Sequence, residues 1–272
     1  MIKHWLEYQG HTFTVSGKRN KIENTIYTFD IETSSYLILN NKVYNTLDYL
    51  NFTKEEQEKS IKQSNMYIWI FGINENIYYG RTWHEFYTML QKVNYYSPYK
   101  KYVFVHNLSF EFEYIKSIFT MKNVTARKSH KVMNCEILDF PMVFKCTYYM
   151  TNCSLEKIPS QFNLEVKKKV GDLDYSKIRN SETPLTEKEL GYCEYDCLVL
   201  YYYIKKELET YKTLKNLPNT ATGKVRKDLK ELIKNNYSYK KKVYKAVNTD
   251  PHVYNLLVDA FARRIYTREL AF

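Results

Sequence analysis

Apolar and polar residues alternate with a period of two over residues 25–32, which predicts a β-strand with two different faces. One face carries Ile26, Thr28, Asp30 and Glu32, and the other carries Tyr27, Phe29 and Ile31. Further apolar runs predict a hairpin over 66–72 and 76–79, a strand over 102–105, and strands over 131–139 and 142–149. We expect the polar stretch 52–64 to be a surface insertion and residues 1–20 to be irregular.

Helical spacing of apolar residues predicts helices over 82–93, behind residue 108, and from about residue 187. The last of these is the best defined, because Thr186 and Glu189 have the spacing of a capping box. Its apolar stripe comprises Leu190, Cys193, Cys197, Leu200, Ile204 and Leu208. Strands followed by alternating strands and helices predict a mixed α/β sheet over residues 20–210.

The 272 residues carry a net charge of +11 and include 28 Tyr, 14 Phe and 3 Trp. Positive charge with many aromatic residues is typical of nucleic-acid binding, but the composition of an AT-rich genome accounts for it equally well. No apolar run approaches the roughly 20 residues of a membrane helix, and the N-terminus does not read as a signal peptide. Five cysteines without a Cys-x-x-Cys pair indicate a reducing cytoplasm, with Cys193 and Cys197 in core packing.

Three short acidic motifs accompany the predicted elements. Asp30 and Glu32 project from one strand face, where a divalent metal would offset the cost of two inward-facing carboxylates. Glu111 lies in the first turn of a helix that follows a strand, at the sheet edge where sites of α/β proteins form. Tyr192 and Asp196 are four residues apart and share one face of the long helix. Alone, each motif also has a purely structural explanation, such as a strand face exposed to solvent or an acid favoured in the first turn of a helix.

In this order the three motifs resemble the Exo I, Exo II and Exo III motifs of the DEDD 3′→5′ exonucleases, in the subclass with Tyr in the third motif. The sequences of three segments are similar to those of the protein-primed family B DNA polymerases of phages and linear plasmids. They are 106–111 (His-Asn-Leu-Ser-Phe-Glu), 152–159 (Asn-Cys-Ser-Leu-Glu-Lys-Ile-Pro) and 171–175 (Gly-Asp-Leu-Asp-Tyr). The resemblance covers residues 25–210 and implies a ribonuclease-H-like α/β fold, a mixed sheet flanked by helices.

The resemblance also implies hydrolysis of single-stranded DNA at its 3′ end with two Mg²⁺ or Mn²⁺ ions. Asp30, Glu32 and Asp196 would hold one ion, Asp30 and Glu111 would lie near the second, and Tyr192 would orient the attacking water. The positions that match DNA-contacting residues of the family are Thr33, His106, Asn107, Phe110, Tyr114, Ser154 and Leu155.

Two positions depart from the family pattern. The acid of the second motif is usually Asp and is Glu111 here, which still reaches a metal but leaves occupancy of the second site open. Val170 stands where the family has a catalytic Lys immediately before Gly-Asp-x-Asp-Tyr. Lys169 takes that catalytic role if the loop shifts by one residue. In the alternative interpretation, residues 167–169 are a run of solvated lysines.

We expect three regions: an N-terminal segment at 1–20, the exonuclease domain at 21–212, and a basic helical extension at 213–272 that leads toward an absent polymerase domain. Residues 260–269 stand where the family has a Tyr/Phe-x-Gly-Gly junction. The run Arg-Arg-Ile-Tyr-Thr-Arg at 263–268 can be encoded so that the next reading frame gives Gly-Gly-Tyr-Thr-Arg. This predicts a frame-shifted end, which the nucleotides beyond codon 272 would test.

The leading interpretation is therefore the proofreading exonuclease part of a protein-primed DNA polymerase. Its substrate would be single-stranded DNA, and its candidate partners are the terminal protein and a separate polymerase chain. A phage-encoded protein of this kind would act in the host cytoplasm. The alternative from another class is a non-catalytic remnant that binds single-stranded DNA or the terminal protein. The sequence His-Asn-Leu-Ser-Phe argues against a third interpretation, a cellular RNA-trimming exonuclease.

Overall fold

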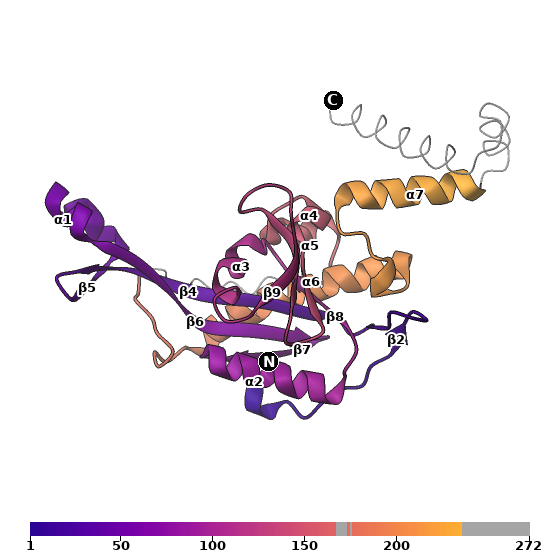
Figure 1. Ribbon diagram of the computed structural model, residues 1–272, viewed down its shortest axis with the longest axis horizontal. Helices are drawn as coiled ribbons and strands as arrows, with labels where there is room; N and C mark the ends of the chain where they lie inside the picture. Colours follow the sequence, from indigo (N-terminus) through magenta and orange to yellow (C-terminus); the bar gives the residue numbers. More distant parts are fainter. Residues whose placement is uncertain (167–172, 175, 236–272) are drawn as a thin grey trace. The chain divides into compact units, whose positions relative to one another are not determined.

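The computed structural model describes residues 1–166, 173–174 and 176–235 (Figure 1). The chain divides into two compact units. The first comprises 1–148 and 153–216, and the second comprises 149–152 and 217–272. The predicted site residues that the structure describes all lie in the first unit.

A mixed sheet of nine strands, counted over the described residues, forms the centre of the first unit. The strands are β1 (Lys3–His4), β4 (Tyr27–Leu39), β5 (Lys42–Asn45), β6 (Ile61–Ile73), β7 (Asn76–Gly80), β8 (Lys101–Val105), β9 (Met121–Ala126), β10 (Val132–Ile137) and β11 (Met142–Cys146). Their order is β1-β7-β6-β4-β8-β11-β10-β9, and β5 pairs with β4. Strand β4 is antiparallel to β6 and parallel to β8, so the strand predicted to carry the acids lies in the middle of the sheet. A separate pair is formed by β2 (Val15–Ser16) and β3 (Ile22–Glu23).

Seven α-helices lie within the described residues: α1 (Lys54–Lys59), α2 (Trp83–Tyr96), α3 (Ser109–Ile115), α4 (Tyr148–Thr151), α5 (Ile158–Gln161), α6 (Glu187–Tyr211) and α7 (Ala221–Asn235). Short 3₁₀ turns occur at η1 (Trp5–Glu7), η2 (Thr46–Asn51), η3 (Leu155–Lys157) and η4 (Leu214–Asn216). Helix α6 begins with the capping box predicted from Thr186 and Glu189, in which the Thr186 hydroxyl accepts from the backbone N–H of Glu189.

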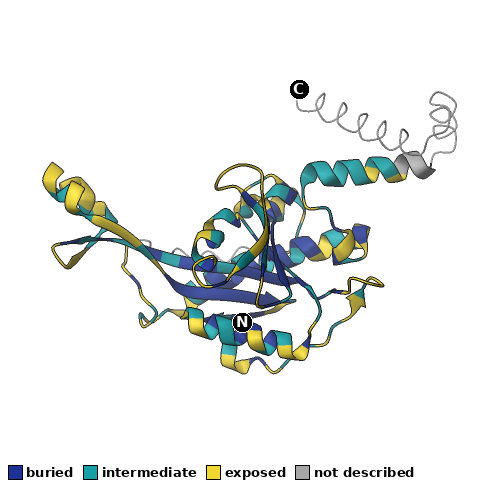
Figure 2. Ribbon diagram, viewed as in Figure 1, coloured by how far each residue is buried: buried dark blue, intermediate teal, exposed yellow. Residues whose placement is uncertain are grey.

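The two faces of β4 and β6 pack against different helices. On one face the rings of Phe29 and Phe86, the latter from α2, stack with their centroids 4.8 Å apart. On the other face Ile68 and Ile70 pack with Cys193 and Cys197 of α6. The predicted alternation along the strand is therefore confirmed, and the polar face of β4 is turned toward α6. The dark strands of Figure 2 show how thoroughly this part of the sheet is buried.

A β-bulge interrupts the pairing of β4 with β6 next to the acidic pair. Glu32 is opposite Ile68, whereas Thr33 is opposite Met66, so Tyr67 is the extra residue on β6. Bulges bend a strand and are frequent beside active sites. Beyond the bulge, β4 and β6 continue into an arm that carries β5, η2 and α1 (Figure 1).

Most of the predicted elements are confirmed, including the hairpin of β6 and β7, helix α2, strand β8, and α6 from residue 187. One interpretation is wrong: residues 1–20 are not irregular throughout, because β1 pairs in parallel with β7. The stretch 52–64 consists of exposed and half-buried residues, as expected of a surface insertion, and it contains α1 and the first residues of β6. The basic extension is described only as far as α7, and its remainder lies outside the described residues. Within the described part, no helix is long and apolar enough to cross a membrane.

Candidate functional site

Three carboxylates from two elements meet on the α6 side of the sheet. Asp30 and Glu32 come from β4 and Asp196 comes from α6, and one ligand atom of each lies within 4.8 Å of the others. The strand contributes two of them because residues i and i+2 share a face. The helix contributes the third because its apolar stripe packs against β6 and places Asp196 over β4.

Glu111 lies beside this group, on the side of Asp30. Its side chain comes from the first turn of α3 and is only 3% exposed. One of its oxygens, Oε2, is buried without a hydrogen-bond partner among the described residues. Burial, followed by the charge of Asp30, raises the pKa of Glu111 well above its ordinary range. The structure thus brings all four predicted acids to one place.

The same crowding affects the pKa values of the strand acids. Burial raises the pKa of Asp30 to about 6, although hydrogen bonds from the Ile31 backbone and from Glu111 oppose the rise. Burial and the charges of Asp30 and Asp196 raise the pKa of Glu32 well above its ordinary range, and the Arg179 charge opposes that rise. Buried carboxylates at this spacing repel one another unless protons or a cation neutralise them.

The donor set fits a divalent cation that prefers oxygen. Carboxylate oxygens are the ligands of Mg²⁺ and Mn²⁺, and the orphaned Oε2 of Glu111 is an unused acceptor at the same place. Cys193 and Cys197 are nearby but are fully buried in the apolar cluster against β6, where burial raises the pKa of both thiols. They pack as predicted, and the fit is to a hard cation rather than to zinc.

Tyr192, the predicted water-orienting residue, lies one helical turn before Asp196 on α6. It is partly buried and packs against the apolar cluster of Ile68, Ile70, Cys193 and Cys197. Residues four apart in a helix share a face, so Tyr192 is on the same face of α6 as Asp196. The structure therefore brings Tyr192 and Asp196 to the same side of the helix.

Four predicted DNA-contacting residues lie between the end of β8 and the end of α3. Asn107 is exposed and has a left-handed backbone, with φ at 60°. The exposed Phe110 ring lies 5.3 Å from that of Tyr114, whose hydroxyl donates to Ser64 Oγ at 2.7 Å. His106 is 3.0 Å from Thr147 Oγ1 through Nδ1, and burial lowers its pKa to about 4, so it is neutral at physiological pH.

The remaining predicted residues are more dispersed along the chain. Thr33 follows Glu32 at the bulge and is half-buried, Ser154 is exposed, and Leu155 begins η3 and is half-buried. The proposed catalytic Lys169 lies outside the described residues, as does Val170.

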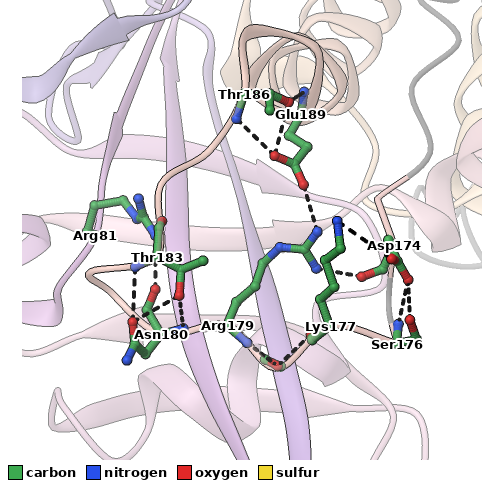
Figure 3. A network of polar contacts seen from close by, with 10 residues as sticks. Arg81, Asp174, Ser176, Lys177, Arg179, Asn180, Thr183, Thr186 and Glu189 are labelled. Carbon is green, nitrogen blue, oxygen red and sulfur yellow. Dashed lines mark hydrogen bonds and ion pairs between the residues drawn. The ribbon is translucent and has the colours of Figure 1, made fainter.

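Two arginines near the site were not predicted from the sequence. Arg179, in the segment before α6, is 4% exposed and donates from Nη2 to Glu189 Oε1 at 2.6 Å (Figure 3). Arg81 donates from Nε to the carbonyl of Tyr67 at 2.6 Å. The only cue in the sequence is that Arg179 is the sole arginine between residues 128 and 225 of a chain rich in lysine.

Comparison with known proteins finds a similarity of fold but no match of sequence. No protein-family model and no curated protein matches the chain. The fold, however, is similar to part of a DNA polymerase in solved structures, and the mixed sheet flanked by helices is consistent with the predicted ribonuclease-H-like fold.

The polymerase in these structures is that of phi29. Its ternary complex with primer-template DNA and incoming nucleotides matches with a TM-score of 0.57 and 16% identity, over 81% of this chain and 36% of that chain. Its complex with single-stranded DNA matches with a TM-score of 0.56 and 17% identity over the same shares. The chain thus spans 36% of the length of those structures, and at this identity the likeness concerns the fold.

Proposed function

We propose that this chain is a metal-dependent 3′→5′ exonuclease for single-stranded DNA, of the kind found in protein-primed family B DNA polymerases. The observation that carries the proposal is the meeting of Asp30, Glu32 and Asp196 within 4.8 Å, with Glu111 buried beside Asp30. It is supported by the order of the three sequence motifs and by the fold likeness to a polymerase that was solved with single-stranded DNA.

In this proposal the carboxylates of Asp30, Glu32 and Asp196 would hold one Mg²⁺ or Mn²⁺ ion, and Asp30 and Glu111 would lie near a second. When bound, two such ions would supply an activated water and charge stabilisation for an in-line displacement at phosphorus. Tyr192 would orient the attacking water through its hydroxyl.

The DNA is bound without regard to sequence. Phe110 and Tyr114 offer rings on which unpaired bases stack, and Asn107, Thr33 and Ser154 offer polar groups for the backbone. Lys169, which lies outside the described residues, is proposed to take the role of the family's catalytic Lys if the loop shifts by one residue.

The direct test is degradation of a 5′-labelled single-stranded DNA oligonucleotide with Mg²⁺. We expect ladders shortened from the 3′ end, abolished by Asp30→Ala combined with Glu32→Ala and unaffected by Glu58→Gln, an exposed acid on α1. An RNA oligonucleotide of the same sequence should be a poorer substrate. Binding without degradation by the intact chain would contradict the proposal and favour the non-catalytic remnant.

A further inference from the structure

The buried guanidinium of Arg179 joins three parts of the first unit. Its Nη1 donates to the carbonyl of Asp174 at 2.5 Å, and its Nη2 donates to Glu189 at the start of α6. Its plane lies over the ring of Tyr67 at 5.6 Å. A fully desolvated arginine is costly unless several acceptors hold it, so these contacts indicate a specific position for the charge (Figure 3).

That position is next to the bulge that follows Glu32. Tyr67 is the extra residue of the bulge, opposite the step from Glu32 to Thr33. The backbone N–H of Arg179 donates to Ser34 Oγ at 2.9 Å. Ser34 lies two residues beyond Glu32 on the same face of β4, about 7 Å along the strand. The segment that carries Arg179 is thus anchored directly beside the strand acids.

Arg81 binds the same segment before α6, but none of its hydrogen bonds given below involves β4, the strand that carries Asp30 and Glu32. Its Nε donates to the Tyr67 carbonyl, and its Nη2 donates to the carbonyls of Asn180 and Thr183 at 2.9 and 2.7 Å. Both arginines thus connect the bulge to the segment before α6. Arg81 therefore provides an internal control for purely structural contributions to this contact.

We propose that Arg179 is a positioning residue that tunes cation binding by the carboxylate cluster of Asp30, Glu32 and Asp196. Its charge offsets the repulsion among the acids when no cation is bound, and opposes the cation when one binds. The cluster stays assembled in the metal-free protein, at the expense of metal affinity. This inference rests on the metal site of the proposed function.

The test measures Mn²⁺ binding to the full chain at a fixed alkaline pH, by calorimetry and by the rise in melting temperature. For Arg179→Met we expect a lower melting temperature without metal, a larger rise with Mn²⁺, and a Kd for Mn²⁺ lower by about tenfold. Arg179→Lys keeps the charge and should keep a Kd near that of the wild type. Arg81→Met should lower the melting temperature equally with and without Mn²⁺.

Glu189→Gln provides a second variant in case Arg179→Met does not fold. Gln preserves the capping box but removes the counter-charge of Arg179, so we expect a Kd for Mn²⁺ that is several-fold higher, on the order of 3-fold. A Kd that is unchanged or higher in Arg179→Met, or unchanged in Glu189→Gln, overturns the role of Arg179. If Mn²⁺ neither binds nor stabilises the wild type, the proposed metal site itself fails, and this inference fails with it.

Discussion

The ring of Phe29 stacks on the ring of Phe86 directly behind the strand face that carries Asp30. The two centroids are 4.8 Å apart and the planes are inclined by 26°. Trp69 and Phe71 also contact Phe86, at 5.2 and 5.9 Å. Because Phe29 and Asp30 are consecutive residues of one strand, this aromatic packing fixes the backbone from which the acids project.

Phe86→Ala is therefore expected to lower the free energy of unfolding by about 3–5 kcal/mol, as for other fully buried aromatic residues. Urea unfolding followed by tryptophan fluorescence would measure the change. Phe86→Leu retains most of the volume and should cost less. A loss smaller than about 1 kcal/mol in the Ala variant would show that α2 does not support the sheet in this way.

The second prediction concerns the charge of Glu111. Since burial and Asp30 raise its pKa, the folded protein disfavours the ionised Glu111 that the unfolded chain carries above pH 4.5. Glu111→Gln removes this cost and should raise the free energy of unfolding of the metal-free protein at neutral pH, by about 1 kcal/mol. The same variant should lower the rate of DNA degradation by at least about 100-fold, because the second cation loses a ligand. Thermal melting in a chelating buffer and the nuclease assay measure the two effects. Equal melting temperatures of variant and wild type would contradict the expected gain in stability.

A third prediction follows from a buried network on the far side of the strand. Glu23 is fully buried, and burial alone would raise its pKa, but hydrogen bonds from His11, Ser97 and Tyr27 outweigh burial and hold the pKa at about 2. Its folded pKa lies below the ordinary value of 4.5. The resulting stability is thus present above pH 4.5 and is lost as the pH falls toward 2.

Glu23→Gln cannot titrate, so the difference in unfolding free energy between wild type and variant should shrink with acid. The expected narrowing between pH 6 and pH 2 is on the order of 3 kcal/mol. Urea midpoints of both proteins across that range would measure it. A difference that stays constant with pH would mean that Glu23 is not held in its ionised form.

The fold was largely predictable because its signals are local. The period-two alternation of β4 and the capping box of α6 depend on residues close in the chain, and both elements begin near the predicted positions. The edge strand β1 was missed because two residues carry no period, and their pairing with β7 spans more than 70 residues. Arg179 was missed because its partners, Tyr67, Ser34 and Glu189, converge only through the bulge. The acids were found by their motifs, whereas their mutual spacing required the structure.

The last prediction concerns the exposed ring of Phe110. This side chain is 41% exposed although it is aromatic, and it lies beside Tyr114 on the helix that also carries Glu111. If unpaired bases stack on it, Phe110→Ala should weaken binding of an oligo(dT) strand by about 1–3 kcal/mol. Fluorescence anisotropy in the presence of a chelator measures binding without degradation.

The matched control is Ile118→Ala, which removes another exposed apolar side chain, 39% exposed, shortly after the same helix. It should leave DNA affinity unchanged. Because Phe110 carries no charge, its variant should keep the salt dependence of the wild type, since that slope counts the ion pairs with phosphate. A change of slope, or an equal loss in the Ile118 variant, would show that Phe110 does not act as a stacking platform. A change of slope would mean that the contact is electrostatic, and an equal loss in the Ile118 variant would mean that any apolar truncation of this surface weakens binding.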